Sequence, residues 1–233
     1  MNIGIIGAGN IGSALAGNLV KLGHQVSIAN SRGPETLGDV AAKTGARPVT
    51  AKQAAHAGEI VVLTIPFKSV PATRADFADV PPGVIVIDTN NYYPEMRDGE
   101  VAPHDVVDSQ WVIEKLGRPV VKVFNNIFSD HLAHNGKPKG TPGRIALPVS
   151  GDDAKAKQAV IDLVEAMGFD AIDNGSIADS WRHQPGTPAY TADLDRAKLT
   201  AALAAADHSK LASYRHNAEA ALRQMLGGKT LHK

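Results

Sequence analysis

The feature that most constrains the fold is a glycine pattern close to the start of the sequence. Gly7-Ala8-Gly9-Asn10-Ile11-Gly12 follows an apolar run, Asn2–Ile6, and leads into a helical pattern. In such a unit Gly7 permits a tight turn, Gly9 lets the backbone approach a pyrophosphate, and Gly12 lets helix and strand pack closely. The N–H groups of Asn10 and Ile11 and the helix dipole then favour phosphate. The pattern predicts a dinucleotide site; the alternative is a Rossmann-like domain that binds nothing there.

Short apolar runs alternate with helical patterns along most of the 233 residues. Runs rich in Val and Ile without strict alternation are typical of strands buried on both faces of a parallel sheet. We therefore predict a doubly wound, mainly parallel α/β sheet of the Rossmann type, with right-handed crossovers. The predicted strands are Asn2–Ile6, Gln25–Ala29, Glu59–Thr64, Val84–Asp88, Val120–Phe124, Arg144–Val149 and Phe169–Ile172.

The strand signals end after Asp173, which suggests two parts of unequal size. Residues 1–180 are expected to form the Rossmann-type domain, and residues 181–233 a small helical C-terminal extension with acceptor-site and dimer contacts. Ile177–Trp181 is predicted to be a short helix, followed by a turn and by helices near 194–205 and 210–226. The segments 90–104 and 134–144 are predicted loops, and the last seven residues are expected to fray.

Composition excludes several classes of function. The sequence has 24 Lys and Arg against 24 Asp and Glu, whereas nucleic-acid and membrane-surface proteins need a basic excess. It has no cysteine, which excludes a thiolate metal site and a cysteine nucleophile. No run of about 18 apolar residues is present, and the first residues do not resemble a signal peptide. We expect a cytoplasmic protein without a nucleic-acid or membrane partner.

The histidines do not predict a metal site. Asp130, His131 and His134 lie on a predicted helix, where positions three apart share a face. Two imidazoles and one carboxylate need a further ligand, and no second cluster supplies one. We expect solvated helix histidines and no metal.

The end of the second predicted strand indicates which dinucleotide binds. An NAD site places Asp or Glu there for the ribose 2′-hydroxyl, about 20 residues after the glycines. This sequence has Asn30, Ser31 and Arg32 instead. Asn30 and Ser31 can donate hydrogen bonds, and Arg32 can pair with a 2′-phosphate. The pattern favours NADP(H), against the alternative that Arg32 is a solvated turn residue.

Later strand ends are expected to complete the cofactor site, because ligands of such sheets bind at the carboxyl ends of the strands. Thr64, Ile65 and Pro66 end one strand, and Asn90 and Asn125 follow the next two. The two asparagines are candidates for hydrogen bonds to the nicotinamide carboxamide or its ribose. Asparagine is also an ordinary turn residue, which is the alternative for both.

Several segments in order resemble one known family. The segments GIIGAGNIGSALA, NSRGPETL, VVLTIPFKSV, VKVFNN, LPVSGDDAKAK and GFDAIDNGSI are similar to those of the NADP oxidoreductase, coenzyme F-420-dependent family. The oxidoreductase domains of STEAP-type metalloreductases resemble the same unit. The resemblance implies that residues 7–12 bind pyrophosphate, that Ser31 and Arg32 bind the 2′-phosphate, that Ile65 and Pro66 flank the nucleotide, and that residues 124–127 lie at the nicotinamide. It covers residues 2–180. The segment from Trp181 to Lys233 is longer than the tail of the deazaflavin-dependent enzymes, and its HQPGTPAY stretch does not match theirs.

The resemblance implies hydride transfer between NADP(H) and a small-molecule redox acceptor, either coenzyme F-420 or a flavin. Stacked, desolvated rings need no catalytic acid or base for this reaction. An alternative is reduction of a small imine or ketone, as in pyrroline-5-carboxylate reductase, for which a proton donor is useful. Candidate donors are His183, Thr187 and Tyr190, each of which can equally be structural. A non-catalytic NADPH-binding sensor is the third possibility.

The alanine-rich C-terminal segment carries an apolar stripe at helical spacing. The stripe consists of Leu194, Leu199, Leu203, Leu211, Ala218, Leu222 and Met225. Such a stripe either covers a sheet edge or pairs with another subunit, and we expect a homodimer.

Overall fold

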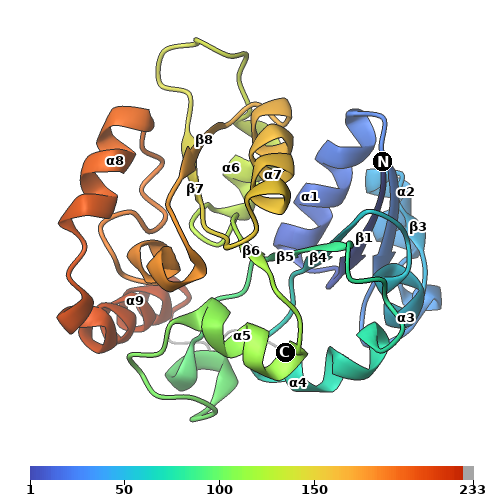
Figure 1. Ribbon diagram of the computed structural model, residues 1–233, viewed down its shortest axis with the longest axis horizontal. Coiled ribbons are helices and arrows are strands. Elements are labelled where there is room, and N and C mark those ends of the chain that lie inside the picture. The colour runs from blue at the N-terminus through green and yellow to red at the C-terminus, as the bar shows by residue number, and fades with distance from the viewer. Residues whose placement is uncertain (228–233) are drawn as a thin grey trace.

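A six-stranded parallel sheet forms the centre of the molecule in the computed structural model, which describes residues 1–227 (Figure 1). The strand order is β3-β2-β1-β4-β5-β6, the doubly wound order that the sequence predicts. The strands are β1 (Asn2–Ile6), β2 (Gln25–Ala29), β3 (Arg47–Pro48), β4 (Ile60–Leu63), β5 (Ile85–Asp88) and β6 (Val121–Lys122). The sequence predicts that the last seven residues, 227–233, fray. Residues 228–233 lie outside the described residues.

Helices cover both faces of this sheet and create two apolar cores. The helices are α1 (Asn10–Lys21), α2 (Gly38–Thr44), α3 (Ala51–Ala55), α4 (Val70–Thr73), α5 (Asp108–Leu116), α6 (Ser129–His134), α7 (Ala154–Ala166), α8 (Arg196–Ala205) and α9 (Leu211–Met225). Helices α1, α6 and α7 contribute to one core, and α3, α4 and α5 to the other (Figure 1). Adjacent β1 residues Ile5 and Ile6 point into different cores, which explains why this strand is apolar without alternation.

The last two predicted strands do not extend the central sheet. β7 (Ala146–Val149) and β8 (Asp170–Asp173) pair in parallel as a separate two-stranded sheet. An antiparallel bridge between Lys122 and Ser150 connects this pair to β6. Phe124 follows β6 with a φ of 63°, so the chain leaves the extended conformation two residues after the strand. The sequence also missed β3, whose two residues are too short to produce a periodic pattern.

The segment after β8 begins with the short helix that the sequence predicts. It is a 3₁₀ helix over residues 177–183, and it begins at a capping box made by Ser176 and Asp179. Leu199 and Leu203 of α8 pack on Ala146 of the small sheet. This part of the apolar stripe therefore covers a sheet, and the pairing of two copies stays a prediction.

Helix α9 anchors the loop after β5, which the sequence predicts over residues 90–104. Residues 94–98 of that loop form one π-helical turn, which the sequence did not predict. The carboxylate of Glu219, which is fully buried, accepts hydrogen bonds from the backbone N–H groups of Glu95 and Met96, both at 3.0 Å. Burial raises the pKa of Glu219, and the two N–H groups oppose this shift.

A second residue of α9 fixes the two ends of the same loop. The buried guanidinium of Arg215 donates to the carbonyl oxygens of Tyr92 at 2.7 Å and His104 at 2.9 Å. It also pairs with the buried carboxylate of Asp108 at 3.0 Å. The C-terminal extension thus determines the path of the chain that leaves β5.

None of the helices within residues 1–227 combines the length and apolar character that a bilayer crossing requires.

Candidate functional site

The glycine turn after β1 has the geometry that its spacing predicts. Gly7 has a φ of +115°, and a Cβ there would lie 1.9 Å from the carbonyl oxygen of Thr64. A Cβ on Gly12 would lie 1.9 Å from the carbonyl oxygen of Gly7. Both contacts are with backbone atoms, so the fold itself requires glycine at these two positions.

Gly9 is different, because nothing in the protein requires it to be glycine. A Cβ on Gly9 would meet no atom within 4 Å, and its φ of −78° is open to any residue. Gly9 is the N-cap of α1, and no side chain caps this helix, whose first turn contains Asn10 and Ile11 and no acidic residue. The open space and the uncapped helix end form a cradle that fits a pyrophosphate.

The turn after β2 exposes the guanidinium of Arg32. The side-chain oxygen of Asn30 accepts a hydrogen bond from the Arg32 N–H at 2.9 Å, and its Nδ2 donates to Thr36 Oγ1 at 2.8 Å. Asn30 therefore shapes the turn, whereas Ser31 and Arg32 are exposed. Among residues 1–227 the Arg32 guanidinium has no hydrogen-bond or ion-pair partner. This donor set fits a phosphate better than a ribose hydroxyl.

The end of β4 lies between the glycine turn and the end of β5. Thr64 contacts the glycine turn, and the Ile65 N–H donates to Asn90 Oδ1 at 2.9 Å, which places Pro66 at the same edge. Asn90 is 3% exposed, and its Nδ2 is buried without a hydrogen-bond partner in the described part of the chain. A buried donor without a partner is rare, so this amide fits a ligand that brings an acceptor.

A buried ion pair joins the ends of β5 and β6. Lys122 and Asp88 are both fully buried, and Lys122 Nζ lies 3.1 Å from Asp88 Oδ2. Ser109 Oγ of α5 donates to the same carboxylate oxygen at 2.6 Å, and the lysine also donates to the carbonyl of Asn90. These hydrogen bonds fix the backbone at the end of β5, where Asn90 and the residues after it lie.

The amide of Asn125 links β6 to the 3₁₀ helix at 177–183. Its Nδ2 donates to the carbonyl of His183 at 2.8 Å and to Asn91 Oδ1 at 3.1 Å. Its Oδ1 accepts from His183 Nδ1 at 2.7 Å, so the remaining ring nitrogen accepts from Ser150 Oγ at 3.2 Å. Asn125 thus has internal partners for both ends of its side chain.

His183 is held as a neutral imidazole. It is fully buried, and burial, with a smaller effect from Lys122, lowers its pKa to about 3. Its Nε2 accepts a hydrogen bond and has no proton to give. The geometry favours the structural alternative for His183 over the proton-donor role.

The other two candidate donors lie close by, and one of them has a partner that the sequence did not reveal. Thr187 is buried, and its hydroxyl donates to the carbonyl of Gln184 at 2.9 Å. The hydroxyl of Tyr190 forms a short hydrogen bond with that of Tyr93 and lies 3.5 Å from Asn91 Nδ2. The only local signal for Tyr93 and Asn91 was their position just after a predicted strand end.

The histidines of α6 have carboxylate neighbours. His131 pairs with Asp193, and His134 Nδ1 lies 3.1 Å from Asp130 Oδ1. Within residues 1–227, no three side chains of His, Asp or Glu come together in an arrangement that would hold a metal ion.

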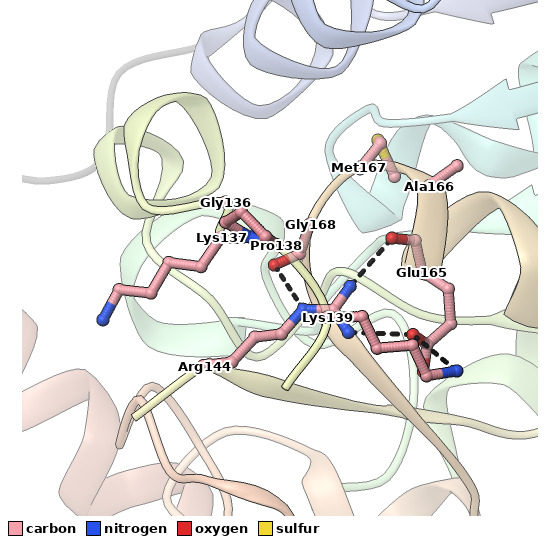
Figure 2. Close-up of a pocket in the computed structure, with 9 residues that line it drawn as sticks. All are labelled: Gly136, Lys137, Pro138, Lys139, Arg144, Glu165, Ala166, Met167 and Gly168. Atoms are coloured by element: carbon pink, nitrogen blue, oxygen red, sulfur yellow. Dashed lines mark hydrogen bonds and ion pairs between the residues drawn. The ribbon is translucent and has the colours of Figure 1, made fainter. Parts of the chain in front are cut away.

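A hollow of about 360 Å³ lies away from this site, between the loop at 136–144 and the end of α7 (Figure 2). It is lined by Gly136, Lys137, Pro138, Lys139, Arg144, Glu165, Ala166, Met167 and Gly168. Arg144 there is already neutralised by Glu165 at 2.9 Å and Asp170 at 2.7 Å. The hollow is at the amino ends of β7 and β8, whereas the site described above is at carboxyl ends of strands.

Comparison with known proteins connects this geometry to a family. Residues 2–92 match the family model described as "NADP oxidoreductase coenzyme F420-dependent". The chain is 27% identical over 179 residues to the metalloreductase STEAP3 of Rattus norvegicus, covering 76% of this chain and 34% of that protein. It spans about half the length, or less, of the curated relatives that it matches.

Solved structures share the fold. The hypothetical protein SMa0349 from Sinorhizobium meliloti is 33% identical, with a TM-score of 0.66 over 76% of this chain and 87% of that one. A protein from Arthrobacter sp. FB24, which its structure names provisionally as an F420-dependent NADP-reductase, is 21% identical to this chain. Its TM-score is 0.67 over 100% of both chains. The second match therefore includes the C-terminal extension.

The two kinds of glycine in the turn predict opposite outcomes on substitution. We expect Gly9→Ala to change the free energy of unfolding by less than about 1 kcal/mol, because its methyl group meets only solvent. The same methyl group should weaken NADPH binding at least about tenfold, since it occupies the space of the phosphate. Gly12→Ala, the matched control, should destabilise the fold by about 1–3 kcal/mol. Urea unfolding and calorimetric titration measure the two effects; unchanged NADPH affinity in Gly9→Ala would contradict the assignment.

The neutral His183 predicts how stability depends on pH. Its pKa is about 3 in the folded protein and about 6.5 when unfolded, so between these values the unfolded chain binds a proton that the folded chain does not. The free energy of unfolding should therefore fall as the pH is lowered through this window, by up to about 1.4 kcal/mol per pH unit from this group. In His183→Gln that share of the slope should disappear. Urea unfolding over a pH series tests this, and equal slopes would show that His183 does not contribute.

Proposed function

We propose that this chain, whose residues 2–92 match the model of the NADP oxidoreductase, coenzyme F420-dependent family, transfers hydride from NADPH to a flavin-like or deazaflavin acceptor. The family consists of NADP-dependent oxidoreductases, which supports NADPH-dependent oxidoreduction as the general reaction. The identity of the acceptor is the specific part of the proposal, with coenzyme F-420 or a flavin as the class.

The observation that carries the cofactor assignment is the exposed, unpaired Arg32 beside Ser31 at the end of β2. With the cradle at Gly9 and the buried Asn90 amide, it provides donors for a 2′-phosphate, a pyrophosphate and a further acceptor group. When bound, NADPH supplies a hydride. The protein has to orient the two rings and exclude water between them, which is sufficient for hydride transfer.

The acceptor side is formed by segments that meet beyond β5 and β6. Asn91 and Asn125 exchange hydrogen bonds, and the Thr191 N–H donates to the Asn126 carbonyl at 2.9 Å. The C-terminal extension thus contacts the segment that follows β6. This supports an acceptor bound between the Rossmann-type domain and the extension.

Cofactor choice is tested by removing the cation at the end of β2. Arg32→Ala should weaken NADPH binding by about 10- to 100-fold, because a charge-assisted hydrogen bond contributes about 1.5–3 kcal/mol. NADH binding should change less than about twofold, since NADH has no 2′-phosphate. Arg196→Ala removes an exposed arginine of α8 and is the matched control. Calorimetric titration with both nucleotides measures the effect, and equal losses for NADPH and NADH would exclude the 2′-phosphate assignment.

The identity of the acceptor is tested by offering the protein a panel of candidate acceptors together with NADPH. We expect NADPH oxidation with coenzyme F-420 or with a flavin (FMN, FAD or riboflavin), followed by absorbance at limiting protein. Activity only with cyclic imines would favour the small-imine reductase, and activity only with ferric chelates would point to a one-electron acceptor. Tight NADPH binding without turnover of any compound would support a sensor and contradict the proposed reaction.

A further inference from the structure

Two tyrosine hydroxyls meet at the acceptor side from segments 97 residues apart in the sequence. Tyr93 lies on the loop after β5, and Tyr190 lies beyond the 3₁₀ helix at 177–183. Their hydroxyls are hydrogen-bonded to each other, and Asn91 Nδ2 lies 3.5 Å from the Tyr190 oxygen. Tyr93 is 7% exposed and Tyr190 is half-buried as a whole residue.

This pair is anchored to the strand ends that form the cofactor site. Asn91 Nδ2 donates to the carbonyl of Asn125 at 2.8 Å, and Asn91 directly follows Asn90, which binds the Ile65 N–H. In doubly wound sheets, ligands bind in the crevice beyond these strand ends. The phenols therefore lie beside the place where a bound acceptor would meet the cofactor.

The backbone that carries Tyr93 is held from several sides. Its N–H donates to Asp98 Oδ2 at 2.9 Å, and Arg97 donates to the carbonyl of Asn91 at 2.6 Å. The Arg97 guanidinium also lies 5.2 Å from the centre of the Tyr93 ring. These contacts preorganise the hydroxyl, as a group that acts on a substrate requires.

The hydrogen-bond inventory of the pair leaves one proton available. Each phenol has one O–H, and one of the two is used within the pair. The described residues offer neither hydroxyl a further acceptor. Burial raises the pKa of Tyr93, and burial together with the neighbouring Tyr93 raises that of Tyr190 well above 10, so both phenols keep their protons near neutral pH.

We propose that the Tyr93–Tyr190 pair donates a proton to the second substrate, and that this substrate is a two-electron acceptor with a C=N or C=O group, free or within a conjugated ring. The inference rests on the proposed function, because NADPH is the reductant. Hydride forms a new bond to the acceptor, and the electron pair of its double bond moves to nitrogen or oxygen. The Tyr190 O–H bond breaks, its proton bonds to that atom, and Tyr190 then regains a proton from solvent.

The test compares Tyr190→Phe and Tyr93→Phe with Tyr214→Phe, which changes a tyrosine of α9 outside the pair. NADPH affinity should stay within about twofold in all three variants. Turnover of riboflavin and of 1-pyrroline under NADPH should fall by about 10²-fold or more in Tyr190→Phe, since a positioned proton donor contributes about 10²–10⁴-fold. Equilibrium binding of riboflavin to the NADP⁺-loaded protein should weaken severalfold in Tyr190→Phe, and Tyr214→Phe should match the parent.

The outcomes separate this inference from the proposed function. Weaker riboflavin binding in the pair variants, with no NADPH oxidation by the parent, would support the hydrogen-bonding role and defeat hydride transfer. Parental turnover and parental binding in both pair variants would overturn the donor role while leaving hydride transfer in place. A parent that neither binds nor turns over riboflavin and 1-pyrroline would overturn the substrate class.

Discussion

The buried ion pair between Lys122 and Asp88 is the interaction on which the ligand-facing edge depends. Two charges without solvent are tolerated only when further hydrogen bonds satisfy them, and here Ser109 and the Asn90 carbonyl do so. The pair sits at the last residue of both β5 and β6. Asn90, Asn91 and Asn125 all lie within three residues of one of its members. This pair therefore fixes the ends of β5 and β6, from which the chain continues to these amides.

Local parts of the fold and the site were predictable from the sequence. The glycine turn is contained in a few consecutive residues, so spacing alone predicted the tight turn at Gly7 and the close packing at Gly12. The role of Arg32 in cofactor binding stays a prediction. The separate β7–β8 sheet was not predictable, because its strands have the same composition as those of the central sheet. The left-handed conformation of Phe124 after β6 was likewise not predictable, because residue type does not predict a positive φ at phenylalanine.

The surroundings of His183, Tyr93 and Tyr190 were harder to predict because their contacts join distant segments. His183 is a candidate proton donor by residue type, yet burial and the Asn125 amide keep it neutral, and neither is visible in the sequence. The same reason explains why Tyr93 was missed. Its partner Tyr190 is 97 residues away, so only the folded chain brings the two hydroxyls together. Residue chemistry gave candidates, and tertiary contacts distinguished among them.

The anchoring of the loop after β5 by α9 also bears on how the protein is made. Glu219 reaches back 124 residues to Glu95, and Arg215 reaches back 123 residues to Tyr92. During synthesis from the N-terminus, the glycine turn and its flanking strands emerge long before the helix that fixes this loop. The strands that flank the glycine turn can thus pair while the loop after β5 still lacks the helix that fixes it. A ligand that binds the folded domain at that stage would stabilise it through mass action, and would therefore act as a folding ligand.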